Sequence, residues 1–99
     1  MTDAELLELL KCDLEIITDY LDAAALASKN NELTMYLNAA KEFISTEGIT
    51  LDLSKLGDCQ LVVMYASWLY EKRRDNNAGM PRMLRWNLNN RLFSERGRA

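Results

Sequence analysis

The chain has 99 residues, of which 48% are hydrophobic and 27% are charged. This length suits one domain with a modest core, and the composition is typical of a globular protein. Histidine is absent, which excludes the Ser-His-Asp and Cys-His triads, zinc bound by histidine and the usual pH switch. No apolar run approaches the roughly 18 residues of a membrane span, and the acidic start MTDAELLELL is unlike a signal peptide. We therefore expect a cytosolic, single-domain protein over residues 1–99 with no membrane partner.

The net charge of −3 hides a division along the chain. Residues 1–60 carry twelve acidic residues and four lysines, whereas residues 61–99 carry eight basic residues and three acidic ones. Every arginine lies at or after Arg73, and arginine favours fixed contacts with carboxylate or phosphate. Two interpretations are open. The acidic surface of one copy meets the basic surface of the next, head to tail, or the two parts neutralise each other within one monomer.

The first helix is predicted over residues 3–13. Thr2 and Glu5 form a capping-box pattern, and leucines with helical spacing follow. Residues 14–30 are predicted to be a loosely defined connection with a helical turn or two near the alanines, because β-branched residues come first and the polar run Ser28–Asn31 follows. In this interpretation Asn30 or Asn31 caps the next helix. The alternative is one long helix through the region.

Three further helices are predicted. The second covers residues 32–47 and ends where Gly48 suits a C-terminal cap. The third covers residues 59–75, with Asp58 as its N-cap; its centre, LVVMYASWLY, is apolar nearly all round, as expected of the central helix. The fourth covers residues 81–95 and has Pro81 at its first position, with a leucine stripe widened by Met83. Gly97 ends it.

The fold class predicted from these elements is all-α, a small bundle of three to four helices with short connections. The helix over 59–75 should pack against those over 32–47 and 81–95. The predicted core residues come from all three of these helices. They are Leu37, Phe43, Ile44, Tyr65, Trp68, Leu69, Leu84 and Leu88.

No set of residues in the sequence suggests catalysis. The glycines are isolated, so there is no phosphate-binding loop. The nearby carboxylates Glu5 and Glu8 suit a solvated helix face better than an acid–base pair. Cys12 and Cys59 match no metal or redox spacing and are expected to be reduced, half-buried thiols. We therefore expect a protein that is not an enzyme and needs no metal or cofactor.

Two kinds of interaction are consistent with the basic C-terminal part. Arg82, Arg85 and Arg96, with Trp86 nearby, have the composition of a phosphate-binding surface. The sequence pI of about 4.9 and the long, polar connection before the last helix argue against sequence-specific DNA binding. Arginine, methionine and aromatic residues are also enriched in protein interfaces, which favours an assembly module. Core packing is the other interpretation of Met80, Met83 and Trp86.

Three stretches carry a resemblance to a known family. They are AAKEFISTEGITL, QLVVMYASWLYEKR and MPRMLRWNLNNRLFSERG. In order and spacing they resemble the phage head–tail connector, or head-completion adaptor, proteins of long-tailed phages and prophages. The resemblance covers residues 39–97 well and residues 1–14 loosely. The residues that fall on the family's positions are Ala39, Ala40, Ile44, Glu47, Gly48, Ile49, Met64, Tyr65, Ala66, Trp68, Leu69, Tyr70, Lys72, Arg73 and Pro81.

This resemblance implies a structural protein that forms a ring beneath the portal. The ring extends the DNA channel, seals the filled head and receives the next connector or tail component. The implied partners are further copies of the chain, the portal protein and that next component, while DNA passes through without specific binding. The implied location is the virion, and the host cytoplasm before assembly. We expect a basic set of residues to meet acids of a neighbouring subunit or of the portal: Arg82, Arg85, Arg91, Arg96 and Arg98. The alternative is a small helical DNA-binding regulator of a mobile element.

Overall fold

The computed structural model describes residues 1–74, 77 and 79–97. Within these residues the chain forms four α-helices and no strand. The helices are α1 (Asp3–Asp13), α2 (Ala23–Thr46), α3 (Leu56–Lys72) and α4 (Arg82–Arg96). The predicted all-α class is therefore confirmed.

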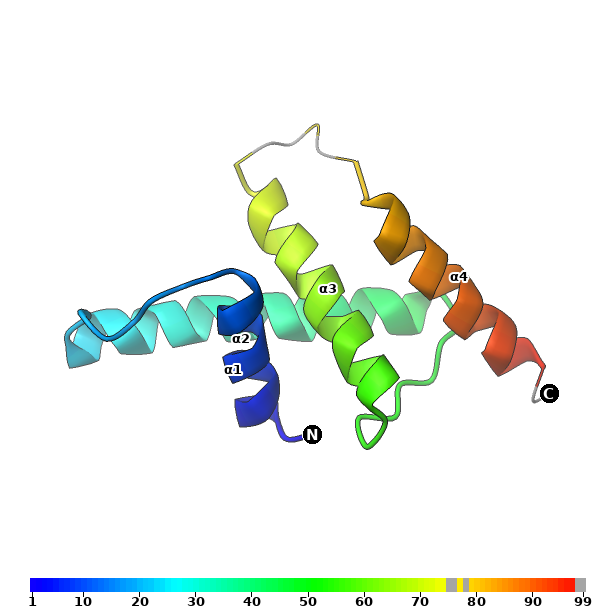
Figure 1. The fold of residues 1–99 in the computed structure, drawn as a ribbon, viewed down its shortest axis with the longest axis horizontal. Coiled ribbons are helices and arrows are strands. Elements are labelled where there is room, and N and C mark those ends of the chain that lie inside the picture. The colour runs from blue at the N-terminus through cyan, green and yellow to red at the C-terminus, as the bar shows by residue number, and fades with distance from the viewer. Residues whose placement is uncertain (75–76, 78, 98–99) are drawn as a thin grey trace.

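The helices form two layers. In Figure 1, α2 runs horizontally behind, and α1, α3 and α4 cross in front of it, with α3 between the other two. The principal extents are 49 × 32 × 19 Å, and the shortest matches two layers of helices about 10 Å thick. Helix α3 packs against each of the other helices, as expected of the central helix. The connection between α1 and α2 runs from beside α3 out to one end of the long axis, and α4 lies toward the other end.

Helix α1 has the predicted bounds because its signals are local. The hydroxyl of Thr2 accepts the Glu5 amide at 3.2 Å, and the Glu5 carboxylate accepts the Thr2 amide at 3.1 Å. This capping box satisfies two backbone donors of the first turn. At the other end the amides of Glu15 and Ile16 donate to the carbonyls of Cys12 and Lys11. These two bonds form a Schellman motif, with Glu15 in the left-handed region at φ 56°.

The predicted start of α2 is wrong. The helix begins at Ala23, where the carboxylate of Asp22 accepts the Ala25 amide at 2.7 Å as the N-cap. Asn30 and Asn31, the expected caps, lie inside the helix. The connection is therefore shorter than predicted, since it covers only residues 14–22 between α1 and α2. For residues 23–31 the structure agrees better with the alternative of one long helix. The C-terminal end agrees with the prediction, because Gly48 follows α2 with φ 98°.

A tertiary cluster holds the early turns of α2 in place. The hydroxyl of Tyr70 on α3 accepts hydrogen bonds from Lys29 Nζ and Arg73 Nη2, each at 3.0 Å. Glu32 lies 3.7 Å from both basic side chains. The hydrogen bond from Lys29 to Tyr70 raises the pKa of Lys29. These contacts stabilise as helix a polar run that resembles a loop in sequence.

Helices α3 and α4 are displaced slightly from their predicted bounds. Helix α3 begins at Leu56 and ends at Lys72, and Lys55 stands at its N-cap without a capping side chain. Asp58 is therefore not the N-cap but lies in the first turn. Helix α4 begins at Arg82, with Pro81 at the N-cap position, and Gly97 is its C-cap. Asp75, the predicted end of the third helix, lies outside the described residues.

The core is formed by residues from all four helices. Its largest fully buried side chains are Leu6, Leu10, Leu33, Ile44, Leu84, Leu88, Val62 and Cys59. Among the predicted core residues, Leu37 and Tyr65 are also buried, whereas Trp68 and Leu69 are partly buried and pack against the core. Phe43 does not belong to the core, because 50% of it is exposed. Its ring stacks on the outer side of Tyr65, with centroids 6.0 Å apart.

Candidate functional site

Helix α4 uses one of its arginines inside the subunit. Arg91 donates to the carboxylate of Asp58 on α3 from Nε at 2.8 Å and from Nη2 at 3.2 Å. Nη2 also donates to the carbonyl of Thr50 at 2.7 Å, and Nη1 to Glu95 at 2.8 Å. The hydrogen bonds to Asp58 raise the pKa of Arg91 further above its usual range. Because these four hydrogen bonds hold Arg91 within the subunit, it is not available to a neighbouring copy.

Arg85 also has an internal partner. Its Nη1 lies 2.8 Å from Oε1 of Glu47, the C-cap residue of α2. The other oxygen of Glu47 is buried and has no hydrogen-bond partner among the described residues. Burial raises the pKa of Tyr65, and the charge of Glu47 raises it further. Arg85 therefore neutralises a half-buried carboxylate where α4 crosses the end of α2, and it remains partly exposed.

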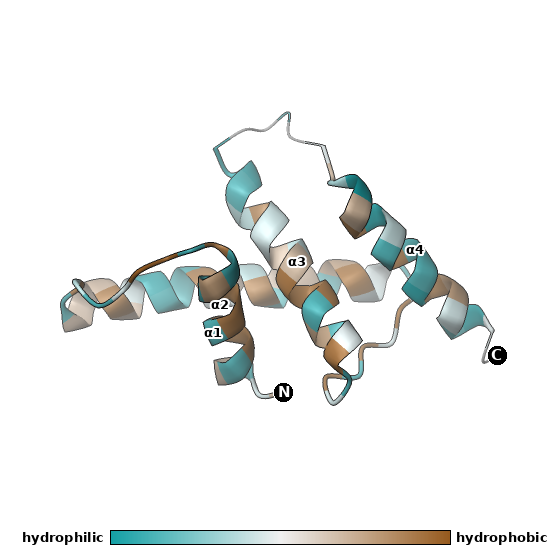
Figure 2. Ribbon diagram, viewed as in Figure 1, coloured by the Kyte–Doolittle hydropathy of each residue, from teal (hydrophilic) through white to brown (hydrophobic). Residues whose placement is uncertain are grey.

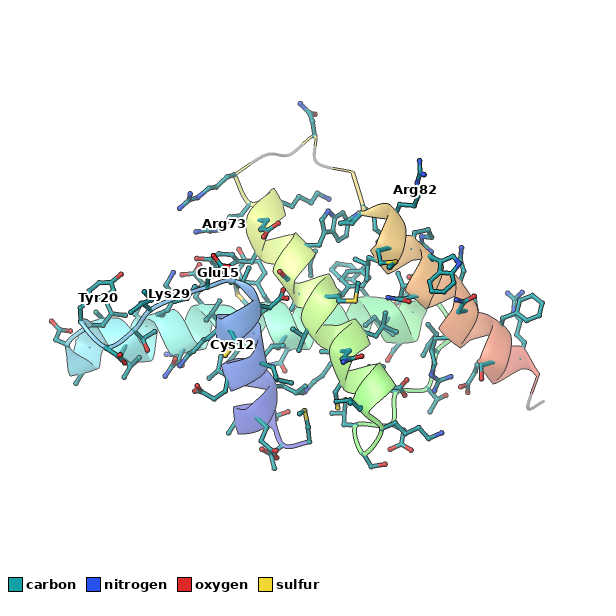
Figure 3. All side chains as sticks on the ribbon, in the orientation of Figure 1. Cys12, Glu15, Tyr20, Lys29, Arg73 and Arg82 are labelled. Carbon is teal, nitrogen blue, oxygen red and sulfur yellow. The ribbon has the colours of Figure 1, made fainter. Side chains whose placement is uncertain are left out.

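Arg82 and Arg96 are exposed arginines at the two ends of α4. Neither makes an ion pair within the part of the chain that the structure describes. Figure 3 shows Arg82 beside the first turn of α4. Arg98 lies outside the described residues. The predicted interface set therefore divides into two satisfied side chains, two available ones and one that is not described.

An apolar stripe accompanies the available arginines. Met83, Trp86 and Phe93 are exposed to 62%, 59% and 80%. They occupy the side of α4 opposite Leu84 and Leu88, which are buried against α3. Figure 2 shows hydrophobic positions set among hydrophilic ones along α4. Core packing is excluded for Met83 and Trp86, and the predicted role of Met83 in the buried leucine stripe is wrong.

A second exposed surface lies on the other side of α3, from the end of α1 outward to Tyr20. In the connection after α1, Ile17 and Tyr20 are 67% and 79% exposed and alternate with acidic residues. Glu15 and Asp19 line a hollow of about 360 Å³ together with Ile17 and the exposed Cys12. This surface is not among the sites predicted from the sequence. The signal available was the alternation of acids with large apolar residues, but exposure could not be inferred from it.

The described residues contain neither a group that could bind a metal nor a helix that could span a membrane. Among them no three His, Cys, Asp or Glu side chains are grouped as metal ligands would be. No described helix combines the length and the apolar character that crossing a membrane requires. Cys12 is exposed and Cys59 buried, so neither thiol is half-buried as expected. The features that remain as a candidate site are the exposed face of α4 and the acidic surface on the other side of α3.

Comparison with known proteins adds no relative to this description. No family model matches the chain, no curated protein matches it, and no solved structure matches it. The features that bear on function are the division of charge along the chain, the exposed surfaces, and the resemblance of residues 39–97 to connector proteins.

Proposed function

We propose that this chain is a structural protein of a phage or prophage, a head–tail connector that forms a ring under the portal. The observation that carries the proposal is the separation, by α3, of an arginine-bearing, apolar face of α4 from an acidic surface after α1. Large exposed apolar groups rimmed by charge mark sites of protein interaction. The resemblance of residues 39–97 to connector proteins supplies the biological setting.

The charge distribution suits such a ring in two ways. Surfaces of opposite charge on opposite sides of α3 suit a head-to-tail contact, and contacts of that type close into rings when the rotation between copies allows it. An acidic protein is also suitable as the wall of a DNA channel, since it repels phosphate and lets DNA pass without holding it. In this role the ring extends the channel, joins head to tail, and binds the portal protein on one side and the next component on the other.

Light scattering and electron microscopy test the proposal. We expect the purified chain, from dilute to millimolar concentration at low salt, to form closed rings with a central channel. A labelled DNA duplex added to the same samples should not bind. Rings that ignore the duplex support the connector role.

The opposite result identifies the alternative function. A monomer or dimer that binds duplex DNA, with an affinity that falls steeply as salt is raised, indicates a small DNA-binding regulator. That outcome overturns the connector role, because a channel wall that grips phosphate would retard the DNA it must pass.

A further inference from the structure

We propose that the exposed face of α4 in one copy docks onto the acidic connection between α1 and α2 of a second copy. The proposal rests on the proposed ring, since it names the two surfaces that would form the contact between neighbouring subunits. We call the first surface the α4 face (Arg82, Met83, Trp86, Phe93 and Arg96). We call the second the acidic turn (Glu15, Ile17, Asp19 and Tyr20).

The α4 face has the composition of an interface without a partner in the subunit. Its three apolar side chains are all more than half exposed, and Trp86 lies between Met83 and Phe93 along the helix. Arg82 lies on the same side of the helix as Trp86 and Phe93, and Arg96 lies one turn beyond Phe93 at the flank of this face. Aromatic, methionine and arginine side chains are those that contribute most at protein interfaces. The face thus presents an apolar centre with a positive charge at each end.

The acidic turn has the complementary composition. Ile17 and Tyr20 are exposed, and Glu15 and Asp19 beside them carry negative charge. Glu15, Ile17 and Asp19 line one hollow, which offers an aromatic side chain of α4 a place to insert. Covering the apolar groups of both surfaces would remove them from water, and the two carboxylates would face two guanidinium groups.

The two surfaces cannot meet within one subunit. Glu15 and Tyr20 lie on one side of α3 and Arg82 on the other, as Figure 3 shows, so α3 stands between the two surfaces. A symmetrical contact of two α4 faces is disfavoured, because it brings arginines of like charge together. Duplex DNA would neutralise the arginines but leave the apolar stripe exposed to water. A second copy, bound head to tail, satisfies both the charge and the apolar stripe.

Charge reversal tests the contact through two double variants. Arg82→Glu with Arg96→Glu makes the α4 face acidic, and Glu15→Lys with Asp19→Lys makes the acidic turn basic. Each double variant alone should weaken self-association at low salt about tenfold or more. Mixing the two should restore association, because every contact then joins opposite charges. The chain with all four substitutions should also associate with itself.

A matched control separates this contact from the overall charge. Glu42 is exposed on α2, outside both surfaces, so Glu42→Lys changes the net charge as Asp19→Lys does and should leave association unchanged. Circular dichroism establishes that each variant keeps its helices. Association that survives either double variant, or that is not restored by mixing, overturns the proposal.

Disulfide linkage gives a second test that needs no charge reversal. Asn90 lies on α4 between Trp86 and Phe93, and Cys12 is an exposed thiol that lines the same hollow as Glu15. Asn90→Cys should give a ladder of linked copies on mild oxidation, and Cys12→Ser should abolish it. Dimers that persist in the Cys12→Ser background indicate contact between two α4 faces and overturn the proposal, as does the absence of any linkage.

Failure of this inference can be told from failure of the connector role. Rings that still form from the Arg82→Glu, Arg96→Glu variant leave the connector role standing and refute the surfaces. Open filaments that respond to charge reversal as described, with no closed ring at any concentration, support the surfaces and refute the connector role.

Discussion

The guanidinium of Arg91 on α4 and the carboxylate of Asp58 on α3 form a two-bond ion pair, with nitrogen–oxygen distances of 2.8 and 3.2 Å. Both side chains are largely buried. The same carboxylate accepts the Asp52 amide at 2.8 Å, and the same guanidinium binds the Thr50 carbonyl. One ion pair therefore joins α4, α3 and the segment between α2 and α3.

Replacing one member of this pair should destabilise the fold. Arg91→Leu leaves the Asp58 carboxylate buried without its cation, and loss of one partner of a buried pair costs about 3–5 kcal/mol. Urea denaturation followed by circular dichroism measures the free energy of unfolding. Arg82→Leu is the matched control, since Arg82 is exposed and should change stability by less than about 0.5 kcal/mol. Equal effects of the two substitutions would contradict the structural role of Arg91.

The stability of the protein should depend on Asp58 at acid pH. Burial by itself would raise the pKa of Asp58, but hydrogen bonds from Arg91 and from the Asp52 amide, together with the charge of Arg91, lower it below 3.8. A carboxyl group whose pKa is lower in the folded state stabilises the fold above its unfolded pKa, and this contribution is lost as the pH falls through the folded pKa.

Melting temperatures across the acid range measure this contribution. We expect the wild-type chain to lose stability as the pH falls below about 4. The Asp58→Asn variant, already less stable at neutral pH, should show a shallower loss over the same range. Parallel curves for the two chains would show that Asp58 does not carry this pH dependence.

Local signals explain which elements were predictable. The bounds of α1 follow from Thr2 and Glu5, which meet within one turn, and the end of α2 follows from Gly48. The start of α2 rests on a local signal, the Asp22 cap, but the polar run that follows it is held as helix by the contact of Lys29 with Tyr70, a partner 41 residues away. Asp58 was assigned to a cap because its real partner, Arg91, is 33 residues away. The spacing of residues in the sequence indicates contacts within one helix, but it does not indicate contacts between residues that are far apart in the sequence.

The candidate site was predictable only in part. The clustering of arginine on the last helix is visible in the sequence and directs attention to α4. The spacing of seven and three residues from Leu84 and Leu88 places Arg91 on the buried side of α4, unlike Arg96. The sequence does not show which acid meets it there, because Asp58 is brought against α4 by the packing of α3. Phe43 illustrates the same limit, since its helical spacing suits a core position but its ring lies outside Tyr65.

The left-handed residue after α1 gives a prediction in the stabilising direction. Glu15 has φ 56°, a conformation that is strained for residues with a Cβ atom and free for glycine. Glu15→Gly should therefore raise the free energy of unfolding by about 0.5–1 kcal/mol, after the greater flexibility of glycine in the unfolded chain is allowed for. Thermal denaturation of the two chains measures it.

Gly48 supplies the reciprocal control for this prediction. It has φ 98° after α2, and an added Cβ would meet only Leu92 at an ordinary distance of 3.5 Å. Gly48→Ala should lower stability by about 1–2 kcal/mol through backbone strain rather than through a clash. A stabilising effect of Gly48→Ala, or a destabilising one of Glu15→Gly, would contradict the assignment of these two positions as helix-ending residues.

Truncating side chains on the two sides of α4 should affect different properties, folding stability on the buried side and self-association on the exposed side. Leu88 is buried against α3, so Leu88→Ala should lower the free energy of unfolding by about 2–5 kcal/mol. Trp86 is 59% exposed, so Trp86→Ala should change stability by about 1 kcal/mol or less despite the larger side chain removed. Urea denaturation and light scattering on the same preparations compare the two effects. Because a side chain retained for contact with a partner should matter for association rather than for folding, we expect Trp86→Ala to weaken self-association while the fold remains. If Trp86→Ala costs as much stability as Leu88→Ala, the exposed stripe belongs to the subunit's own packing and not to an interface.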